Sequence, residues 1–167
     1  MTLAEQLDLI LSFRKSAPVN VEGLAAALSI RLRHVSLPAE VSGMIERSGD
    51  GYTISVNAAD PVTRQRFTIA HELGHYVYHR HLLGEGVDED RAYRSIATGK
   101  YRNTRIGKRE ETEANKFAVN LLMPMDLIDK LRRDEALTTP EQLARRLGVS
   151  LHTMSIRLGV PYRHAAE

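Results

Sequence analysis

The feature that most constrains this 167-residue chain is the run HELGH at residues 71–75, which fits the pattern H-E-x-x-H. Asp60-Pro61, ahead of this run, is a typical helix start, because aspartate can cap free backbone amides and proline at the first helical position lacks only an amide that would be unpaired anyway. The helix is expected to end at about residue 78 or 79. Residues four apart on a helix share one face, with Cβ atoms about 5–6 Å apart, so His71 and His75 can bind one ion.

The residue types in this run favour a catalytic zinc ion. Zinc binds neutral histidine nitrogen at about 2.0–2.1 Å, and a catalytic site uses three protein ligands and a water molecule. Glu72 is offset from His71 around the helix and can direct its carboxylate at that water. The expected reaction is peptide hydrolysis, in which zinc lowers the pKa of the water and polarises the carbonyl, while Glu72 takes the proton and later delivers it to the leaving amine.

A third ligand must come from elsewhere, and two histidines that follow the run are candidates. His81 stands where an extended metzincin pattern has its third histidine, but Tyr78 occupies the place of the glycine that lets the backbone turn. His79 continues the series on the same helix face, yet it lies a further turn, about 5.4 Å, along the axis from His75. A packed or hydrogen-bonding role for His79 is the alternative.

Glu113 is the third candidate, and it lies in a second expected helix over residues 110–122. It borders an apolar face that includes Ala114, Phe117 and Leu121, so it can reach across to a packed neighbouring helix. The alternative is that Glu113, with the acidic residues just before it, belongs to a solvated first turn stabilised by the helix dipole. Spacing alone leaves these two interpretations open.

Composition excludes several other classes of protein. The 23 basic and 21 acidic side chains give a net charge of +2, too small to indicate nucleic acid or an anionic membrane as the main partner. Without cysteine, disulfides, thiolate catalysis and cysteine-bound zinc are excluded. No apolar segment approaches membrane-spanning length, and the first residues, with Glu5 and Asp8, do not resemble a signal peptide. We expect a cytoplasmic protein with no membrane partner.

The rest of the chain predicts an α+β fold. Residues 30–35, 41–46 and 52–56 have the character of short strands, with a hairpin turn at residues 48–51, and a small antiparallel sheet is expected. Pro124 ends the second strong helix, another helix begins near Met125, and Thr139-Pro140 starts the first of two final helices. The final pair fits a helix-turn-helix over residues 140–158, with Gly148 in its turn.

Several motifs in the same order resemble the ImmA/IrrE family of metallopeptidases. They are RFTIAHELGH at 66–75, EANKFA at 113–118 and LLMP at 121–124, supported by the strand at 52–57 and by LARRLGVS at 143–150. The resemblance covers most of residues 20–160. It implies a compact zincin-like domain with zinc on His71, His75 and Glu113, and with Glu72 as catalytic acid and base. Proteases of the family that this chain resembles cleave transcriptional repressors of phages, mobile elements or stress regulons. The resemblance therefore implies a helix-turn-helix repressor as the protein substrate.

We therefore expect a zinc metalloendopeptidase with a zincin-like domain over residues 1–130 and a C-terminal helical segment, 131–167, packed on it. The alternative function is a DNA-binding or repressor-sequestering regulator in which zinc is structural. In that case His152, Thr153 and Arg157 would be the residues available to read base edges. Direct DNA contact is the less favoured interpretation, because a helical hairpin can equally pack on the catalytic core.

Three further features carry expectations about how the site is built. Gly74 costs helix stability relative to alanine, which suggests a close approach, plausibly of the sheet under the metal. The strand at 52–57 could pair with an extended peptide substrate if it lies at the sheet edge; an ordinary core strand is the alternative. Seven basic residues between Arg91 and Arg109 could form a lid that steers an acidic partner, or simply a solvated loop.

Overall fold

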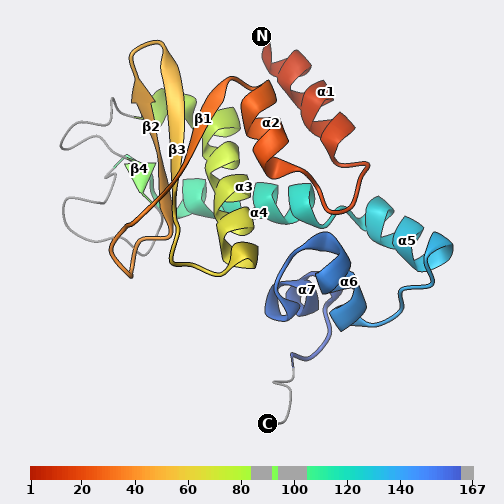
Figure 1. Ribbon diagram of the computed structural model, residues 1–167. Helices are drawn as coiled ribbons and strands as arrows, with labels where there is room; N and C mark the ends of the chain where they lie inside the picture. Colours follow the sequence, from red (N-terminus) through yellow and green to blue (C-terminus); the bar gives the residue numbers. More distant parts are fainter. Residues whose placement is uncertain (84–91, 94–104, 163–167) are drawn as a thin grey trace.

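A computed structural model describes residues 1–83, 92–93 and 105–162 of the chain (Figure 1). A small sheet lies on one side of the molecule, with helix α3 (Val62–Tyr78) packed against it and helix α4 (Lys108–Leu122) crossing behind. Helix α2 (Val21–Ala27) lies beside α3, and α1 (Leu3–Phe13) lies on the outer side of α2. Helices α5 (Met125–Asp134), α6 (Pro140–Leu147) and α7 (Leu151–Leu158) follow at the opposite end from the sheet. The α+β class predicted from the sequence is confirmed.

The sheet is mixed rather than purely antiparallel. Its strands are β1 (Ile30–Val35), β2 (Gly43–Ser48), β3 (Gly51–Asn57) and the two-residue β4 (Ala92–Tyr93), in the spatial order β1-β3-β2-β4. The hairpin between β2 and β3 is antiparallel, and β4 pairs antiparallel with β2. Strand β1, however, pairs in parallel with β3, because the connection after β1 carries the chain past β3 to its far side before the hairpin begins.

The position of β3 decides between the two interpretations of residues 52–57 in favour of an ordinary core strand. Strand β3 has β1 on one side and β2 on the other, so its backbone groups already take part in two ladders. Its last five residues are buried, as a strand covered on both faces requires. Asn57 is the last residue of the strand. Its side-chain Nδ2 atom donates to the carbonyls of Leu37, Pro38 and Val41, and its Oδ1 atom accepts from the Ala59 backbone amide.

Helix ends agree with the sequence to within a few residues. Helix α3 ends at Tyr78, as expected, but it begins at Val62 with Pro61 in the cap position and no side-chain cap, so Asp60 does not fulfil its predicted role. Helix α4 begins two residues before the expected start. The turn between β2 and β3 contains Gly49 with a φ of 60°, a left-handed conformation that glycine adopts at little cost.

The C-terminal helices share one hydrophobic core with the rest of the protein. Leu143, Leu147 and Met154 are fully buried and belong to the same cluster as the side chains of α2, α3 and the sheet. The predicted division of the chain at residue 130 falls within α5, and it stays a prediction.

Arg66 of α3 fixes the position of the C-terminal pair. Its guanidinium donates to the carbonyls of Leu147 and Gly148 at 3.2 and 3.1 Å, and to that of Val19 at 2.9 Å. Gly148 has a φ of 66°, and a Cβ atom there would lie 2.8 Å from the Arg66 Nε atom. The glycine thus both ends α6 and leaves room for the guanidinium that joins α6 to α3.

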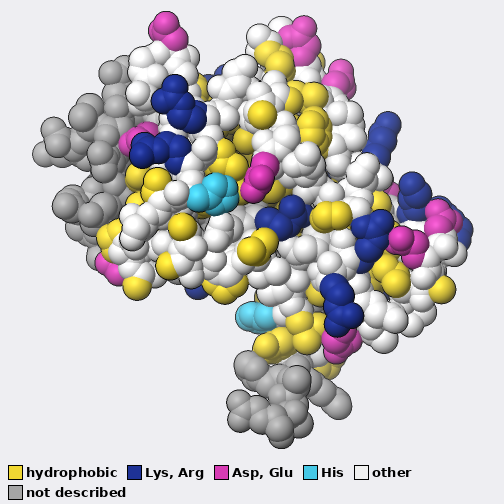
Figure 2. Space-filling view, in the orientation of Figure 1, with side chains coloured by type: hydrophobic (Ala, Val, Ile, Leu, Met, Phe, Trp, Pro, Cys, Tyr) yellow, Lys and Arg dark blue, Asp and Glu magenta, His cyan; other side chains and the backbone are white. Residues whose placement is uncertain are grey.

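Basic and acidic side chains are interspersed over the face shown in Figure 2, in keeping with the small net charge. Most of the basic run at 91–109 lies outside the described residues, and so does the proposed lid. In the part of the chain that the structure describes, no helix is long and apolar enough to cross a membrane.

Candidate metal centre

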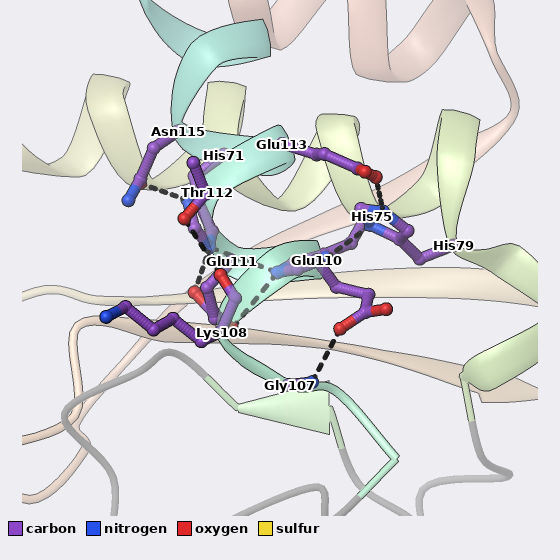
Figure 3. A network of polar contacts seen from close by, with 10 residues as sticks. All are labelled: His71, His75, His79, Gly107, Lys108, Glu110, Glu111, Thr112, Glu113 and Asn115. Atoms are coloured by element: carbon purple, nitrogen blue, oxygen red, sulfur yellow. Dashed lines mark hydrogen bonds and ion pairs between the residues drawn. The ribbon is translucent and has the colours of Figure 1, made fainter.

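The second half of α3 and the His79 residue that caps its C-terminal end bury four ionisable side chains. His71 is 2% exposed, Glu72 0%, His75 1% and His79 4%. Burying such groups is costly unless they find polar partners, since each loses its interactions with water. The partners of the three histidines come mainly from the first two turns of α4, which pack against this part of α3 (Figure 3).

His71 and His75 converge on one carboxylate, that of Glu111. The two Nε2 atoms lie 3.1 Å apart. Glu111 places Oε2 3.1 Å from the Nε2 atom of His71 and Oε1 3.3 Å from that of His75. The three ligand atoms lie within 4.8 Å of one another, so this group could hold a metal ion.

Glu113 is not brought to the histidine pair. Its Oε2 atom lies 2.8 Å from the Nε2 atom of His79, and its Oε1 atom accepts a hydrogen bond of 2.9 Å from Arg109. Residues two apart on a helix point about 200° apart around its axis, so Glu111 and Glu113 cannot face the same point. Glu111 therefore replaces Glu113 as the carboxylate at the candidate metal centre.

The sequence contains a signal that favours Glu111. Burial on α4 follows the series Glu111, Ala114, Ala118 and Leu121, with the spacing of a helix face turned to the interior. Glu113 is partly exposed, whereas the Glu111 residue is 9% exposed. The sequence-based interpretation considered only Glu113 as a ligand, with a solvated first turn of all three glutamates as the alternative, and did not weigh Glu111 by itself.

Asn115 lies one helical turn after Glu111 and orients His71. The Asn115 Oδ1 atom lies 2.8 Å from the Nδ1 atom of His71. An amide oxygen only accepts hydrogen bonds, so the imidazole Nδ1–H donates to it and the Nε2 atom keeps its lone pair. That lone pair points to the space shared with His75 and Glu111, as a metal ligand requires.

Gly74 lets α3 and α4 approach closely enough for these contacts. A Cβ atom at this position would lie 3.1 Å from the Ala114 Cα atom and 3.1 Å from two atoms of Phe117. The close approach predicted for this glycine is therefore present, but its neighbour is α4 and not the sheet. The glycine lies between His71 and His75, at the level where α4 supplies its carboxylate.

The acid–base state of Glu111 fits a metal ligand. Burial alone would raise its pKa, but the contacts with His71 and His75 outweigh burial and lower the pKa to about 2. The carboxylate is therefore ionised at neutral pH. Its Oε2 atom is buried, and the 3.1 Å contact with the Nε2 atom of His71 does not have the geometry of a hydrogen bond. Two imidazole nitrogens and one ionised, incompletely satisfied carboxylate are a donor set that suits zinc.

The other sequence candidates fall outside this group of three. His79 hydrogen-bonds to its neighbours, with its Nδ1 atom 3.0 Å from that of His75, which was the alternative considered for it. His81 is exposed in the short 3₁₀ helix Arg80–Leu82. Glu72 follows His71 directly in α3 and is fully buried beside the candidate metal centre.

Comparison with known proteins bears on the fold and the family of this chain. A search of curated proteins found no significant match. Among solved structures, a Mycobacterium tuberculosis transcriptional regulator is similar with a TM-score of 0.56 and 22% identity over 95% of this chain. The match spans 47% of the regulator, so this chain corresponds to about half of it, and the likeness shows the fold alone.

The family model described as peptidase M78, IrrE N-terminal-like domain, matches residues 25–159. The matched region includes the sheet, α3 with its H-E-x-x-H run, α4 and both C-terminal helices. This covers most of the chain, in agreement with the resemblance found in the sequence motifs. The chain belongs to the M78 family of peptidases with an IrrE N-terminal-like domain.

Proposed function

We propose that this protein is a zinc-dependent endopeptidase that cleaves a protein substrate in the cytoplasm. The observation that carries the proposal is the convergence of His71 Nε2, His75 Nε2 and Glu111 on one point beside Glu72. Membership in a peptidase family supports hydrolysis of a peptide bond as the reaction. The two histidines and Glu111 are the proposed zinc ligands.

Each residue has a distinct role in the proposed reaction. When bound, zinc supplies Lewis-acid polarisation of the scissile carbonyl and a lower pKa for the attacking water. Glu72 takes the proton from that water and later gives it to the leaving amine. Asn115 holds the His71 ring so that its Nε2 lone pair faces the metal position.

The favoured substrate is a transcriptional repressor with a helix-turn-helix domain, from a phage, a mobile element or a stress regulon. This proposal rests on the sequence resemblance to the ImmA/IrrE family. The structural neighbour bears the name transcriptional regulator, but at 22% identity the likeness extends no further than the fold.

The alternative, a DNA-binding regulator with structural zinc, finds less support in the C-terminal pair. Arg157 donates to the Met123 carbonyl and to Asn120, so its guanidinium joins α7 to the end of α4. Thr153 interacts with the capping Ser150 side chain. Of the three residues considered for reading bases, His152 is exposed, but one residue is a small surface for sequence recognition.

Cleavage is tested by incubating the zinc-loaded protein with the repressor encoded by a neighbouring reading frame and measuring intact masses. We expect two fragments whose masses sum to that of the repressor plus one water. The variant Glu72→Gln keeps the side-chain size but removes the base, and we expect the rate to fall about 10²–10⁴-fold while zinc remains bound.

The exposed Glu141→Gln in α6 is the matched control and should cut at the wild-type rate. Cleavage at the wild-type rate by Glu72→Gln would overturn the mechanism. An intact repressor after incubation with the zinc-loaded wild-type protein would contradict the repressor as substrate. Duplex DNA binding that survives His71→Ala, without proteolysis, would favour the alternative function.

A further inference from the structure

His79 and Glu113 form a chain of contacts that leads outward from the candidate metal centre (Figure 3). The His75 ring has its Nε2 atom toward Glu111 and its Nδ1 atom 3.0 Å from the Nδ1 atom of His79. The other nitrogen of His79 lies 2.8 Å from Glu113, which also accepts from Arg109. The metal ligand, a second histidine, a carboxylate and a guanidinium thus follow one another from the interior to the surface.

The chemistry of these groups fixes the direction of each hydrogen bond. Glu113 accepts a hydrogen bond from the Arg109 guanidinium, and a carboxylate paired in this way only accepts. The Nε2–H of His79 must therefore donate to Glu113. A neutral imidazole carries one proton, so the Nδ1 atom of His79 accepts. The Nδ1–H of His75 is then the donor to it, which leaves the Nε2 atom of His75 with a lone pair.

We propose that His79 and Glu113 are positioning residues that hold His75 in the one tautomer able to bind the metal. The inference rests on the proposed zinc site. Without His79, the His75 ring could rotate and could carry its proton on Nε2, and both changes remove the lone pair from the metal position. The sequence suggested Glu113 as a metal ligand. In this proposal its carboxylate instead orients His79, and His79 in turn orients the ligand His75.

Helix α4 thereby supplies one proposed ligand and the residues that orient the other two. It acts on His71 directly and on His75 through His79. Glu111 approaches the metal position itself, and Asn115 on the same helix face orients His71 directly. Glu113 points away from that face and orients His75 through His79. His79 is 4% exposed, so the chain of hydrogen bonds from His75 through His79 lies in the protein interior. It reaches the surface at Glu113, whose side chain is 41% exposed.

The first test is zinc affinity, measured by competition with a chromophoric chelator in wild-type protein and variants. Loss of an outer partner of a metal ligand typically costs about 10–100-fold in affinity, and we expect this increase in Kd for His79→Ala. His79→Gln should recover most of the affinity, because its amide oxygen can accept from His75 while its NH₂ group donates to Glu113. Glu113→Ala should weaken binding less than His79→Ala.

The exposed His81→Ala is the matched control and should bind zinc with wild-type affinity. Wild-type protein that does not bind zinc would overturn the proposed function. Wild-type protein that binds zinc, together with a His79→Ala variant of unchanged Kd, would overturn the positioning role alone. Thermal melting of each metal-free variant distinguishes a loss of fold from a loss of the hydrogen bonds that orient His75.

The second test reads the tautomer directly and needs no metal. Imidazole ¹⁵N NMR of the metal-free protein should show His75 protonated at Nδ1 and His79 protonated at Nε2. In Glu113→Ala, which alters a partly exposed side chain and should not affect folding, the two His79 tautomers should both become populated. A proton on the Nε2 atom of His75 in the wild-type protein would contradict the inference.

Discussion

Two pairs of packed helices in this molecule bury very different side chains. Where α3 meets α4, buried polar residues face one another, among them His71, His75, His79 and Glu111. Where α6 meets α7, the inner face consists of apolar residues such as Leu143, Leu147 and Met154. Both pairs belong to one protein core, and α7 also buries the Ser155 hydroxyl, but among the described residues only the first pair buries ionisable side chains, which cost more free energy to remove from water.

The difference in buried side chains indicates different roles for the two interfaces. The α6–α7 interface supports the fold, and the α3–α4 interface carries the candidate site. An apolar interface stabilises the fold by removing surface from water, and the α6–α7 pair has this character. Its polar groups serve local structure, with Thr139 and Ser150 capping the two helices. A buried cluster of histidines and a carboxylate stabilises a fold poorly, so its presence at the α3–α4 interface indicates a chemical role.

The largest expected effect is on metal binding at the α3–α4 interface. Glu111→Ala removes a proposed ligand and should raise the zinc Kd by more than the roughly 10–100-fold expected for loss of an outer partner. Glu113→Ala, two residues away on the same helix, should remain within that smaller range. Isothermal titration or chelator competition on both variants measures the contrast. Equal losses, or a larger loss at Glu113, would restore the assignment that the sequence suggested.

Removal of zinc should lower the melting temperature. A ligand that binds only the folded state contributes about 2.7 kcal/mol at a free concentration of 100 times its Kd, which for a chain of this length corresponds to about 5–10 °C. Differential scanning fluorimetry with zinc and with a chelator measures the shift. An unchanged melting curve after verified metal removal would mean that no ion binds the folded state tightly.

Arg66→Met should destabilise the fold while leaving the metal centre intact. The variant keeps an apolar stem but removes the donors to the Val19, Leu147 and Gly148 carbonyls, and hydrogen bonds from charged groups are worth about 1.5–3 kcal/mol. Urea denaturation should show a loss of about 2 kcal/mol, and zinc affinity of the folded variant should stay at the wild-type value. A large loss of zinc affinity would show that the scaffold and the site are coupled.

Thr139→Ala is expected to have the smallest effect. Thr139 caps α6 by accepting from the Gln142 amide, and loss of such a cap typically costs about 1 kcal/mol. Denaturation should show this small loss with full zinc binding and unchanged cleavage. Reduced cleavage in a stable, zinc-loaded variant would instead give the C-terminal pair a part in substrate recognition.

Local patterns were enough to predict the α+β class, the helix that carries the H-E-x-x-H run and the final helix pair. These features depend on residues close together in the chain, such as the spacing of His71 and His75 or the turn at Gly148. The parallel pairing of β1 with β3 could not be predicted in this way. It depends on the path of the connection after Val35, which short-range signals do not specify.

The sequence could not decide between Glu111 and Glu113 for a related reason. Which face of α4 turns toward α3 depends on how the two helices pack, and Gly74 determines that packing through contacts with Ala114 and Phe117. A family motif places a glutamate in the right segment, but two glutamates two residues apart point in nearly opposite directions. Only the packed structure shows that Glu111 lies at the histidine pair and that Glu113 lies at His79.

The most direct test of the account is a crystal structure of the zinc-loaded protein with anomalous data collected at the zinc edge. The account predicts a single anomalous peak bonded to His71 Nε2, His75 Nε2 and a Glu111 oxygen, with His79 between His75 and Glu113. A peak bonded to Glu113 or His79, or no peak between the three proposed ligands, would contradict it.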